Sequence, residues 1–489
     1  MFNSKVKRIC AAVLAAAVAG SLVGCADKTE KSGGASPIVW YLKKPIDNMS
    51  SYDIVMGEAN KTIKKEVGTT LEFKMIEYGS YDEKLNVLCA SGDKFDIAYV
   101  EDTAKFQQYI KSGAFIPIDD LLEKYGKDIL AMRDDISKEF SKYEGKQYAV
   151  DSQTVYSVAQ SLVFKKDLVE KYNFDYKSVK SYYDLEPFLK QIKDNEPGMI
   201  PLFHSMGDFV NNDVSYSSIE GIVFDEVNEK FVLEYDIPKT MDFLRLKNDY
   251  YKKGYIASDA ISRDGASERN SGKYAVFNNG GYYSEDGSKA TATFGFPCVE
   301  TFTGNTVISP KLCGRNAISA TSKQPEKAIQ LLNLIWKDEN LLNTLAYGIE
   351  GVNYTVNEER TKELGKKSVN VQSGNKQTWA IWHNWLGYLW GQWDSAWNSA
   401  EALENMKKVN ESATKSKTLG FAFDTEPVKS EAAKITAAAT ELGKVIQCGC
   451  MTDFDTYMTG ARKKLMDSGA QKVLDEMNKQ YTEWKKNKD

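Results

Sequence analysis

Strand-like and helix-like segments alternate along the chain after residue 36, and this order limits the folds that the chain can adopt. Short apolar segments predict strands in three places: 36–42, 71–76 and 95–100. Apolar residues at helical spacing predict a helix after each of them: 51–67, 81–90 and 103–112. Strands separated by helices pair in parallel, so the sequence predicts an α/β fold whose sheet is flanked by helices.

The alternation continues through the rest of the chain without an internal repeat. Further strands are predicted at 155–164 and 274–277, the second ending in a tight turn at 278–281 (NNGG). Ser181 and Asp184 have the spacing of a capping box that opens a helix. The other predicted helices are one from Lys166, 238–253, 325–336 with a buried stripe of Ala328, Leu331, Leu332 and Ile335, and most of 454–486.

The beginning of the chain has the pattern of a secretory signal. Lys5, Lys7 and Arg8 precede an apolar run at 9–18. This run is about half the length that spans a bilayer as a helix, roughly 20 residues, so a permanent transmembrane anchor is a poor interpretation.

The tetrad Leu22-Val23-Gly24-Cys25 resembles a bacterial lipobox, so residues 1–24 are expected to be removed and Cys25 to carry lipid. The alternative is an ordinary signal with a chance cysteine. Two acyl chains on one cysteine are enough for stable anchoring. Residues 25–36 are polar and are expected to form a flexible tether that holds the protein at the extracellular face of the cell membrane.

Composition narrows the classes of function. A chain of 489 residues is too long for one ordinary core and suits two large lobes. Its formal net charge is −5 and its basic residues are scattered among acidic ones, which argues against nucleic acid as a partner. Two histidines, His204 and His383, cannot build a histidine-rich metal site, and no cofactor or metal is predicted. Cys448 and Cys450 are expected to be structural thiols or one optional disulfide.

Several short segments occur in an order that resembles one protein family. They are 77–81 (EYGSY), 92–99 (GDKFDIAY), 113–118 (GAFIPI), 181–187 (SYYDLEP), 195–197 (NEP), 346–354 (AYGIEGVNY) and 465–474 (LMDSGAQKVL). With the lipobox, they resemble the extracellular solute-binding lipoproteins of bacterial ABC importers, in the carbohydrate-type branch related to maltose-binding protein. Within that branch, the chain is most similar to the Firmicutes subgroup that carries a distinctive C-terminal extension.

The resemblance implies two α/β lobes, joined by two or three crossing segments, with the ligand in the cleft between them. It places 37–150 plus about 313–352 in lobe 1, and about 151–312 plus 353–489 in lobe 2, with a helical C-terminal tail. The crossings are expected near 149–156, near 308–318 and after Gly351.

An aromatic run at 379–397 (WAIWHNWLGYLWGQWDSAW) contains six tryptophans and suggests a binding surface. Aromatic rings stack on the C–H faces of sugars and lose little side-chain entropy on binding. The candidates for the cleft are Trp379, Trp382 and Trp385. The alternative is the core stripe of a helix, which would contain Trp382, Trp385, Leu386 and Leu389; core positions are also expected for Trp390, Trp393 and Trp397.

Other candidates follow the predicted strand ends, where α/β proteins bind ligands. They are Trp40, Tyr41, Tyr78, Glu101 and Asp102. For the two carboxylates, capping of the next helix is the alternative to ligand binding. Candidates at or near the predicted crossings and the 278–281 turn are Asp151, Gln153, Tyr156, Tyr282, Tyr283 and Tyr354.

Together these features predict a monomeric lipoprotein that captures a carbohydrate, in the first place an oligosaccharide. It would deliver this ligand to the permease subunits of an ABC transporter without catalysis. A peptide or another polar solute stays open as the ligand. A surface glycosidase, which needs two carboxylates about 5–10 Å apart, and a sensor or adhesin are alternatives from other classes.

Overall fold

The computed structural model describes residues 36–157, 159–204, 213–263, 268–281, 283–284, 286–305, 307–308 and 313–488. The predicted signal, Cys25, nearly all of the tether and Tyr282 lie outside these residues. Met1–Ser36 and Pro37–Asp489 are separate units, and the fold described below is that of the second. No helix within the described ranges combines the length and apolar character needed to cross a membrane.

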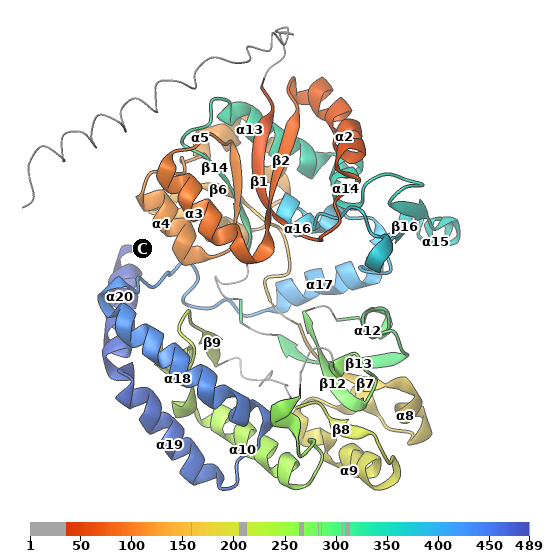
Figure 1. Cartoon of the computed structure of the whole chain (residues 1–489), viewed down its shortest axis with the longest axis vertical. Coiled ribbons are helices and arrows are strands. Elements are labelled where there is room, and N and C mark those ends of the chain that lie inside the picture. Colours follow the sequence, from red (N-terminus) through yellow and green to blue (C-terminus); the bar gives the residue numbers. More distant parts are fainter. Residues whose placement is uncertain are drawn as a thin grey trace, which may run out of the picture. The chain divides into compact units, whose positions relative to one another are not determined.

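The first lobe is built on a five-stranded sheet with the strand order β2-β1-β3-β14-β6 (Figure 1). The strand bounds are β1 Ile38–Lys44, β2 Leu71–Glu77, β3 Ile97–Val100, β6 Ala149–Asp151 and β14 Arg315–Ile318. β1 pairs in parallel with both β2 and β3, which confirms the parallel arrangement expected from the sequence. β14 runs antiparallel to β3 and β6, so a segment from far along the chain completes the sheet.

Helices cover both faces of this sheet, because successive strand residues point to opposite sides. Ile97 and Tyr99 lie in one apolar cluster with residues of α2, α13 and α14, whereas Ala98 and Val100 lie in a second with residues of α3 and α4. The four residues of the predicted stripe in α13 are all fully buried. The helix bounds are α2 Tyr52–Val67, α3 Tyr81–Ser91, α4 Thr103–Lys111, α5 Asp119–Tyr125, α6 Lys127–Met132, α7 Asp135–Phe140, α13 Pro325–Lys337 and α14 Glu339–Tyr347.

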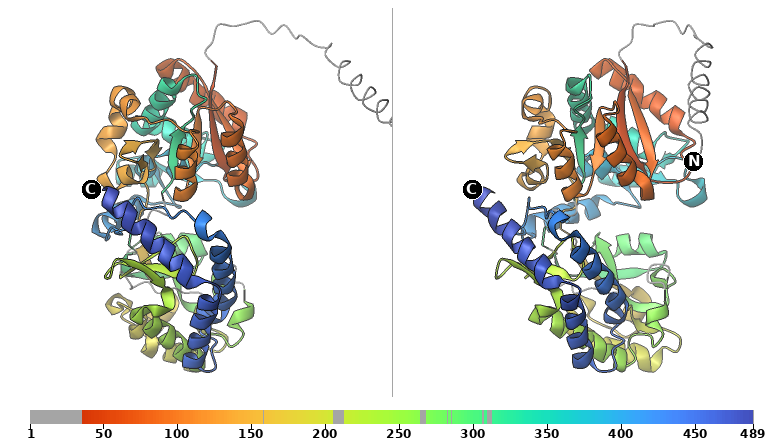
Figure 2. Two further views of the ribbon diagram at one scale, coloured as in Figure 1. Left: turned by 90° about the vertical axis from the view of Figure 1, so that its left-hand side faces the viewer. Right: turned by 60° about the vertical axis from the view of Figure 1, so that its left-hand side comes forward.

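The second lobe has a separate hydrophobic core. Within the described residues, two sheets and seven α-helices surround it. Its sheets have the orders β13-β7-β12-β8 and β11-β10-β9. The strands are β7 Ala159–Lys165, β8 Ile200–Leu202, β9 Val214–Tyr216, β10 Ile222–Asp225, β11 Lys230–Leu233, β12 Tyr274–Gly281 and β13 Cys298–Asn305. The helices are α8 Lys166–Lys171, α9 Glu186–Asn195, α10 Pro238–Lys252, α12 Ser288–Phe294, α18 Lys429–Cys448, α19 Phe454–Asp467 and α20 Ala470–Lys488. The last three pack together, with α18 also against α10 (Figures 1 and 2).

A small third sheet follows α14. It consists of β15 Tyr354–Val356, β16 Ser368–Val371 and β17 Asp394–Ser395. The helices in this part of the chain are α15 Glu358–Leu364, α16 His383–Leu386 and α17 Ala400–Ser412.

Two local predictions differ from the structure. The predicted tight turn at 278–281 is wrong, because β12 continues through Gly281 and pairs with β7 along these four residues. The continuous ladder to β7 outweighs the local turn preference of asparagine and glycine. The capping box between Ser181 and Asp184 is present, but it opens a short 3₁₀ turn, Tyr182–Leu185, that leads into α9.

The chain passes from the first lobe to the second between β6 and β7, and it returns between β13 and β14. A third crossing follows Gly351, but it lies further along the chain than the predicted boundary near residue 353, since Trp379 and Trp385 still pack in the apolar cluster of the first lobe. The chain enters the cluster of the second lobe again only at Phe421, after α17. The run of tryptophans therefore belongs to the first lobe, although the predicted boundary assigned it to the second.

Gly449 allows a test of close backbone packing in the second lobe. It ends α18 with a φ of +68°, and a Cβ at this position would lie 2.6 Å from the carbonyl oxygen of Lys247. We expect Gly449→Ala to lower the free energy of unfolding by clearly more than the roughly 1–2 kcal/mol of left-handed strain on alanine. Gly365→Ala is the matched control, because Gly365 has a φ of +66° and open space around the missing Cβ. Urea unfolding compares the two variants, and equal losses would contradict the prediction.

Candidate ligand-binding cleft

The parallel strands of the first lobe end at one edge of the sheet, and polar and aromatic side chains gather there. Tyr78 follows β2, and Glu101 follows β3. Lys43, near the end of β1, forms an ion pair with Glu101, and its Nζ lies 4.5 Å from the centre of the Tyr78 ring. The Tyr99 hydroxyl donates a hydrogen bond to Glu101 Oε1 at 2.9 Å. The carboxylate is thus held in place from two sides.

Tryptophans from the run at 379–397 cover this edge. The Trp385 ring is fully buried, and its centre lies 5.7 Å from that of Tyr99 and 6.4 Å from that of Tyr78. The Trp382 ring lies 4.4 Å from that of Trp385. Tyr78 and Trp382 are 55% and 48% exposed, so two rings are open to solvent above a buried one. We refer to Tyr78, Trp382, Trp385 and the Lys43–Glu101 pair as the aromatic edge.

Hydrogen bonds, rather than a long helix, position this run. The run contains one α-helical turn, His383–Leu386, and a separate 3₁₀ turn, Leu389–Gly391, so the alternative of a continuous helical core stripe is wrong. Asn316 Nδ2 of β14 donates to the Trp385 carbonyl oxygen at 3.0 Å, and Trp379 Nε1 donates to that of Leu345 at 2.9 Å. Of the three tryptophans expected in the core, Trp393 is buried, Trp390 is half-buried and Trp397 is 50% exposed.

Arg315 positions the turn between β3 and α4. Its guanidinium is fully buried and donates to the Glu101 carbonyl oxygen at 2.9 Å and to Thr103 Oγ1 at 2.7 Å. It also donates to the carbonyl oxygens of Phe140 and Cys313. Burial lowers the pKa of Arg315, yet the hydrogen bonds satisfy the group on several sides. The cation thus fixes both residues that flank Asp102.

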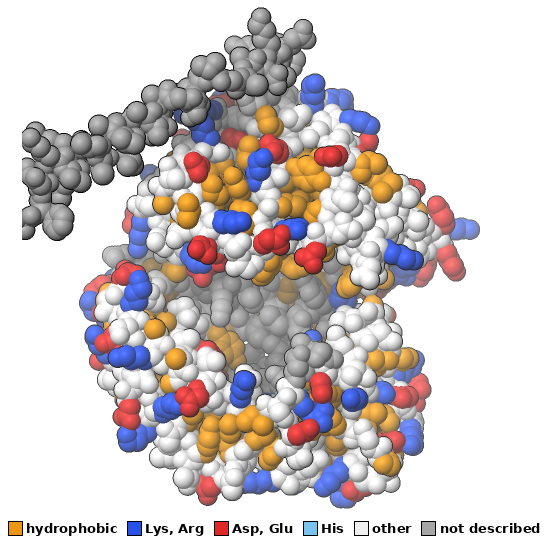
Figure 3. Space-filling model, viewed as in Figure 1, with side chains coloured by type: hydrophobic (Ala, Val, Ile, Leu, Met, Phe, Trp, Pro, Cys, Tyr) orange, Lys and Arg blue, Asp and Glu red, His pale blue; other side chains and the backbone are white. Residues whose placement is uncertain are grey.

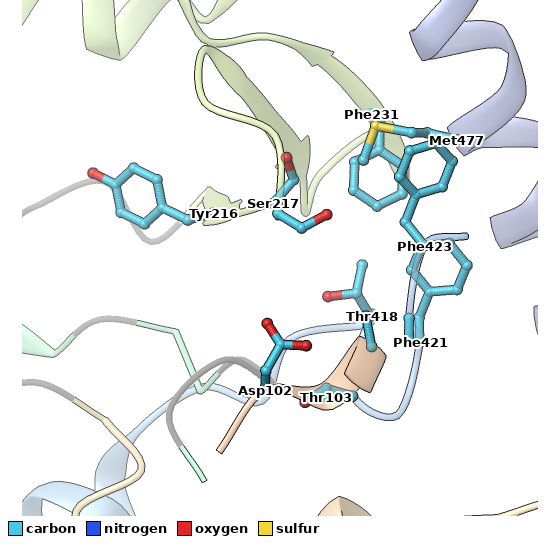
Figure 4. Close-up of a pocket in the computed structure, with 12 residues that line it drawn as sticks. Asp102, Thr103, Tyr216, Ser217, Phe231, Thr418, Phe421, Phe423 and Met477 are labelled. Atoms are coloured by element: carbon cyan, nitrogen blue, oxygen red, sulfur yellow. The ribbon is translucent and has the colours of Figure 1, made fainter. Parts of the chain in front are cut away.

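Asp102, Thr103 and Ala104 of the first lobe line one side of a pocket whose other lining residues come from the second lobe (Figure 4). Asp102 Oδ1 accepts a hydrogen bond from the Lys105 backbone at 2.8 Å, so the side chain also caps α4, as the alternative interpretation expected. The cavity volume is about 180 Å³. We call it the interlobe pocket; it is lined by Asp102, Thr103, Ala104, Tyr216, Ser217, Ser218, Phe231, Thr418, Phe421, Ala422, Phe423 and Met477. Close by, Gln107 Nε2 of α4 donates to the Gly420 carbonyl oxygen at 3.4 Å.

The remaining candidates from the sequence lie away from the aromatic edge. Trp40, Asp151, Gln153, Tyr156, Tyr354 and Trp379 are buried, and Tyr41 and Tyr283 are half-buried against Phe95 and Phe302, respectively. A buried ring has no face available to a ligand in this structure. Tyr282 lies outside the described residues.

Asp151 is held at the end of β6 by structural contacts. Its Oδ1 lies 3.4 Å from Arg133 Nη1 and 3.4 Å from Ser141 Oγ. Burial raises the pKa of the carboxyl, and the neighbouring Arg133 opposes that change. These contacts give Asp151 a role in the strand that leads out of the first lobe.

Several residues of the candidate site were not identified from the sequence. Lys43 and Lys44 are the charged residues at the end of an otherwise apolar strand, a signal that could have been used. Arg315, Thr418 and Phe421 carry no local signal, because their partners are far away in the sequence. Among the residues that the structure describes, no group of three or more His, Cys, Asp or Glu side chains could hold a metal ion.

Colouring by residue type shows charged residues of both signs where the first lobe borders the hollow in the middle of the view (Figure 3). On the face shown, neither sign of charge is confined to one part of this border.

His383 provides a pH-dependent test of how the tryptophan run is held. Complete burial lowers its pKa to about 3, and its Nε2 lies 3.0 Å from Asn343 Oδ1. Between about pH 6.5 and pH 3 the unfolded chain binds a proton at this position that the folded chain does not. We therefore expect the free energy of unfolding to fall on acidification by up to about 1.4 kcal/mol per pH unit from this group.

The matched variant is His383→Gln, which keeps a hydrogen-bond donor for Asn343 but cannot titrate. Chemical unfolding between pH 7 and pH 4.5 should show a steeper loss of stability for the original chain than for the variant. Parallel pH profiles would mean that His383 is not buried in its neutral form.

Comparison with known proteins agrees with this architecture. Residues 47–341 match the family described as bacterial extracellular solute-binding protein, and residues 417–486 match a domain of unknown function, DUF3502. Over 483 residues, or 96% of each chain, the sequence is 29% identical to a carbohydrate ABC transporter substrate-binding protein of Streptococcus pneumoniae serotype 4 (strain ATCC BAA-334 / TIGR4). It is 23% identical over 410 residues to the polygalacturonan/rhamnogalacturonan-binding protein YtcQ of Bacillus subtilis (strain 168), covering 72% of this chain and 75% of YtcQ.

Solved structures of the N-glycan transport solute binding protein NgtS from Streptococcus pneumoniae share the fold. The NgtS structure without a named glycan has a TM-score of 0.78 at 28% identity, and the match covers 93% of this chain and 100% of NgtS. The complex of NgtS with Man1GlcNAc has a TM-score of 0.66 at 27% identity, covering 92% and 99% of the two chains. The complex with Man5GlcNAc has a TM-score of 0.63 at 28% identity, covering 93% and 100%. Because the family match spans more than half of the sequence and the two-lobed fold agrees with it, the chain belongs to the bacterial extracellular solute-binding proteins.

Proposed function

We propose that the protein captures an oligosaccharide between its lobes and delivers it, unchanged, to the permease of an ABC transporter. The observation that carries this proposal is the aromatic edge, where the half-exposed rings of Tyr78 and Trp382 both pack on Trp385, and Lys43, which lies over the Tyr78 ring, pairs with the Glu101 carboxylate. Rings of this kind stack on sugar C–H faces, and carboxylate oxygens accept hydrogen bonds from sugar hydroxyls. The carbohydrate relative and NgtS support the same ligand class.

The described structure fits the open state of such a protein. Its TM-score is 0.78 with the NgtS structure that carries no named glycan and 0.66 and 0.63 with the two glycan complexes, although the identities are nearly equal. A ligand that contacts both lobes stabilises the closed state by its differential affinity for that state. We infer that glycan binding closes the lobes around the aromatic edge.

The arrangement favours a sugar over the alternatives. Lys43 and Glu101 pair with each other, so neither is reserved for the terminus of a peptide. Glu101 also accepts the hydrogen bond from Tyr99, whereas a glycosidase needs one carboxyl group that donates a proton to the leaving oxygen. We therefore propose binding without turnover. Incubation with an oligosaccharide panel separates the two, because binding raises the unfolding temperature and enzymatic cleavage changes the glycan.

Loss of either exposed ring should weaken glycan binding. We expect Tyr78→Ala and Trp382→Ala each to raise the Kd for an oligosaccharide about 5- to 30-fold, the equivalent of about 1–2 kcal/mol of stacking and burial. Tyr183→Ala is the matched control, because Tyr183 is 57% exposed but lies in the 3₁₀ turn before α9. Isothermal titration calorimetry gives the three values. Unchanged affinity in both edge variants, or an equal loss in the control, would contradict the proposed site.

We also propose that Cys25 carries the lipid anchor of a monomer at the extracellular face of the membrane. The lipobox tetrad supports this proposal. Cys25→Ser should move the protein from the membrane fraction to the medium, because a chain without acyl groups has no stable anchor. Mass spectrometry of the N-terminal peptide checks the modification directly. Membrane retention of the variant would exclude lipidation as the anchor.

A further inference from the structure

Asn410 lies where two of the segments that connect the lobes come together. It is buried near the end of α17, a helix that packs on Leu389 and Trp390 of the first lobe. The first crossing leaves β6 at Asp151 and reaches β7 at Ala159. The helix therefore belongs with the first lobe, and the crossing beside it leads to the second.

The Asn410 side chain forms three hydrogen bonds with the backbone of the first crossing. Its Oδ1 accepts from the N–H of Tyr156 at 2.9 Å and from the N–H of Ser157 at 3.4 Å. Its Nδ2 donates to the Thr154 carbonyl oxygen at 2.7 Å. A single asparagine can do this because its amide carries an acceptor and donors in one planar group. We call these three hydrogen bonds the crossing clasp.

The clasp supplies the partners that a strand would otherwise give. Residues 154–157 lie between β6 and β7 and belong to neither strand. Thr154, Tyr156 and Ser157 are buried, so their backbone groups are shielded from water and need partners within the protein. Loss of the Asn410 amide would remove a partner from two N–H groups and one carbonyl oxygen, which destabilises this conformation of the crossing.

The clasp also determines how far the first lobe extends along the crossing. Gln153 is attached to the first lobe, because its N–H donates to the Gly387 carbonyl oxygen at 2.8 Å and its carbonyl oxygen accepts from the Leu389 N–H at 3.0 Å. The clasp carries this attachment on to Ser157, close to the start of β7 at Ala159. The part of the crossing that is fixed to the first lobe thus reaches almost to the second.

The third crossing is attached to the second lobe shortly after Asn410. Ser416 Oγ donates to Glu226 Oε1 at 2.6 Å and lies 3.1 Å from Ser215 Oγ of β9. The Ser416 N–H donates to the Ile308 carbonyl oxygen at 2.9 Å, which joins the second and third crossings. Asn410 therefore stands at the first-lobe end of the third crossing while its side chain holds the first.

We propose that Asn410 is a positioning residue for closure of the lobes. By holding the first crossing on α17, it limits the ways in which the open lobes move relative to each other. Fewer open conformations reduce the entropy that a ligand must remove on closure. The effect on affinity rests on the proposed capture of a ligand between the lobes, whereas the effect on the ligand-free lobes does not.

Double electron–electron resonance between two spin labels measures the effect on the ligand-free protein. Non-natural amino acids carry the labels at Lys61 of α2 and Lys190 of α9, two exposed positions in different lobes. We expect Asn410→Ala to widen the distribution of distances at least about 1.5-fold, because the freed crossing gains backbone conformations. An unchanged width in this variant would overturn the inference.

Asn248→Ala is the matched control. Asn248 is also buried, and its Nδ2 donates to the carbonyl oxygens of Gly449 and Met451, but these contacts lie within the second lobe. Both variants should lower the unfolding temperature, because each removes the partner of buried backbone groups. The control should leave the distance distribution unchanged. Equal widening in the two variants would indicate general destabilisation and would overturn the assignment to Asn410.

Asn410→Asp provides a second variant in case the alanine variant does not fold. The carboxylate keeps the shape of the side chain and the acceptor for Tyr156 and Ser157, but it has no N–H for the Thr154 carbonyl oxygen. We expect the distribution to widen less than in Asn410→Ala but more than in Asn248→Ala. A folded aspartate variant with the original width would contradict the role of the clasp.

Ligand binding separates this inference from the proposed function. For a glycan that binds the original chain, we expect Asn410→Ala to raise the Kd about 3- to 10-fold, because more open conformations compete with closure. The Kd of Asn248→Ala should stay within about twofold of the original value. If the distribution widens but no glycan binds the original chain, the inference stands and the proposed function fails. If a glycan binds and the distribution does not widen, the function stands and the inference fails.

Discussion

The parallel pairing of β1 with β2 and β3 is the constraint on which the proposed binding surface depends. Because the three strands run in the same direction, Lys43, Tyr78 and Glu101 reach one edge although they are far apart in sequence. The sheet can only keep this arrangement while both of its faces are covered, which α2, α13 and α14 on one side and α3 and α4 on the other provide. The same three strands therefore position the residues of the proposed binding surface and contribute side chains to the apolar core.

The buried charge of Arg315 then positions the β3–α4 turn at that edge. Arg315 has no exposed surface, and its hydrogen bonds to Glu101 and Thr103 hold the backbone of the β3–α4 turn. A buried guanidinium is stable only when its donors are satisfied, so the turn and the cation require each other. Since Arg315 lies on β14, the strand by which the chain returns from the second lobe, the turn is held by a segment next to a crossing.

The sequence predicted those strands and helices that depend on local patterns of apolar residues. The first three strands and their helices follow apolar periodicity, and the structure has them within a few residues. Features that depend on contacts between distant segments were not predicted. Asn278 to Gly281 form part of a strand because β7 pairs with them. The tryptophan run packs in the first lobe, where Asn316 and Leu345 form hydrogen bonds with it. Tyr78, Glu101 and Trp382 were predicted as candidate binding residues from strand ends and aromatic clustering. Lys43 and Arg315 were not predicted, because they depend on partners that are distant in the sequence.

In the proposed site, which is divided between two lobes, partly exposed rings are accessible to a ligand. Tyr78 and Trp382 are supported from below by the buried Trp385, so a glycan can stack on them without first ordering mobile side chains. Contacts with the first lobe alone bind the open and closed states equally and cannot shift the equilibrium between them. Contacts that also involve the second lobe differ between the two states, because only they change when the lobes close. The aromatic edge would therefore supply affinity, and closure would require a ligand that also reaches the second lobe.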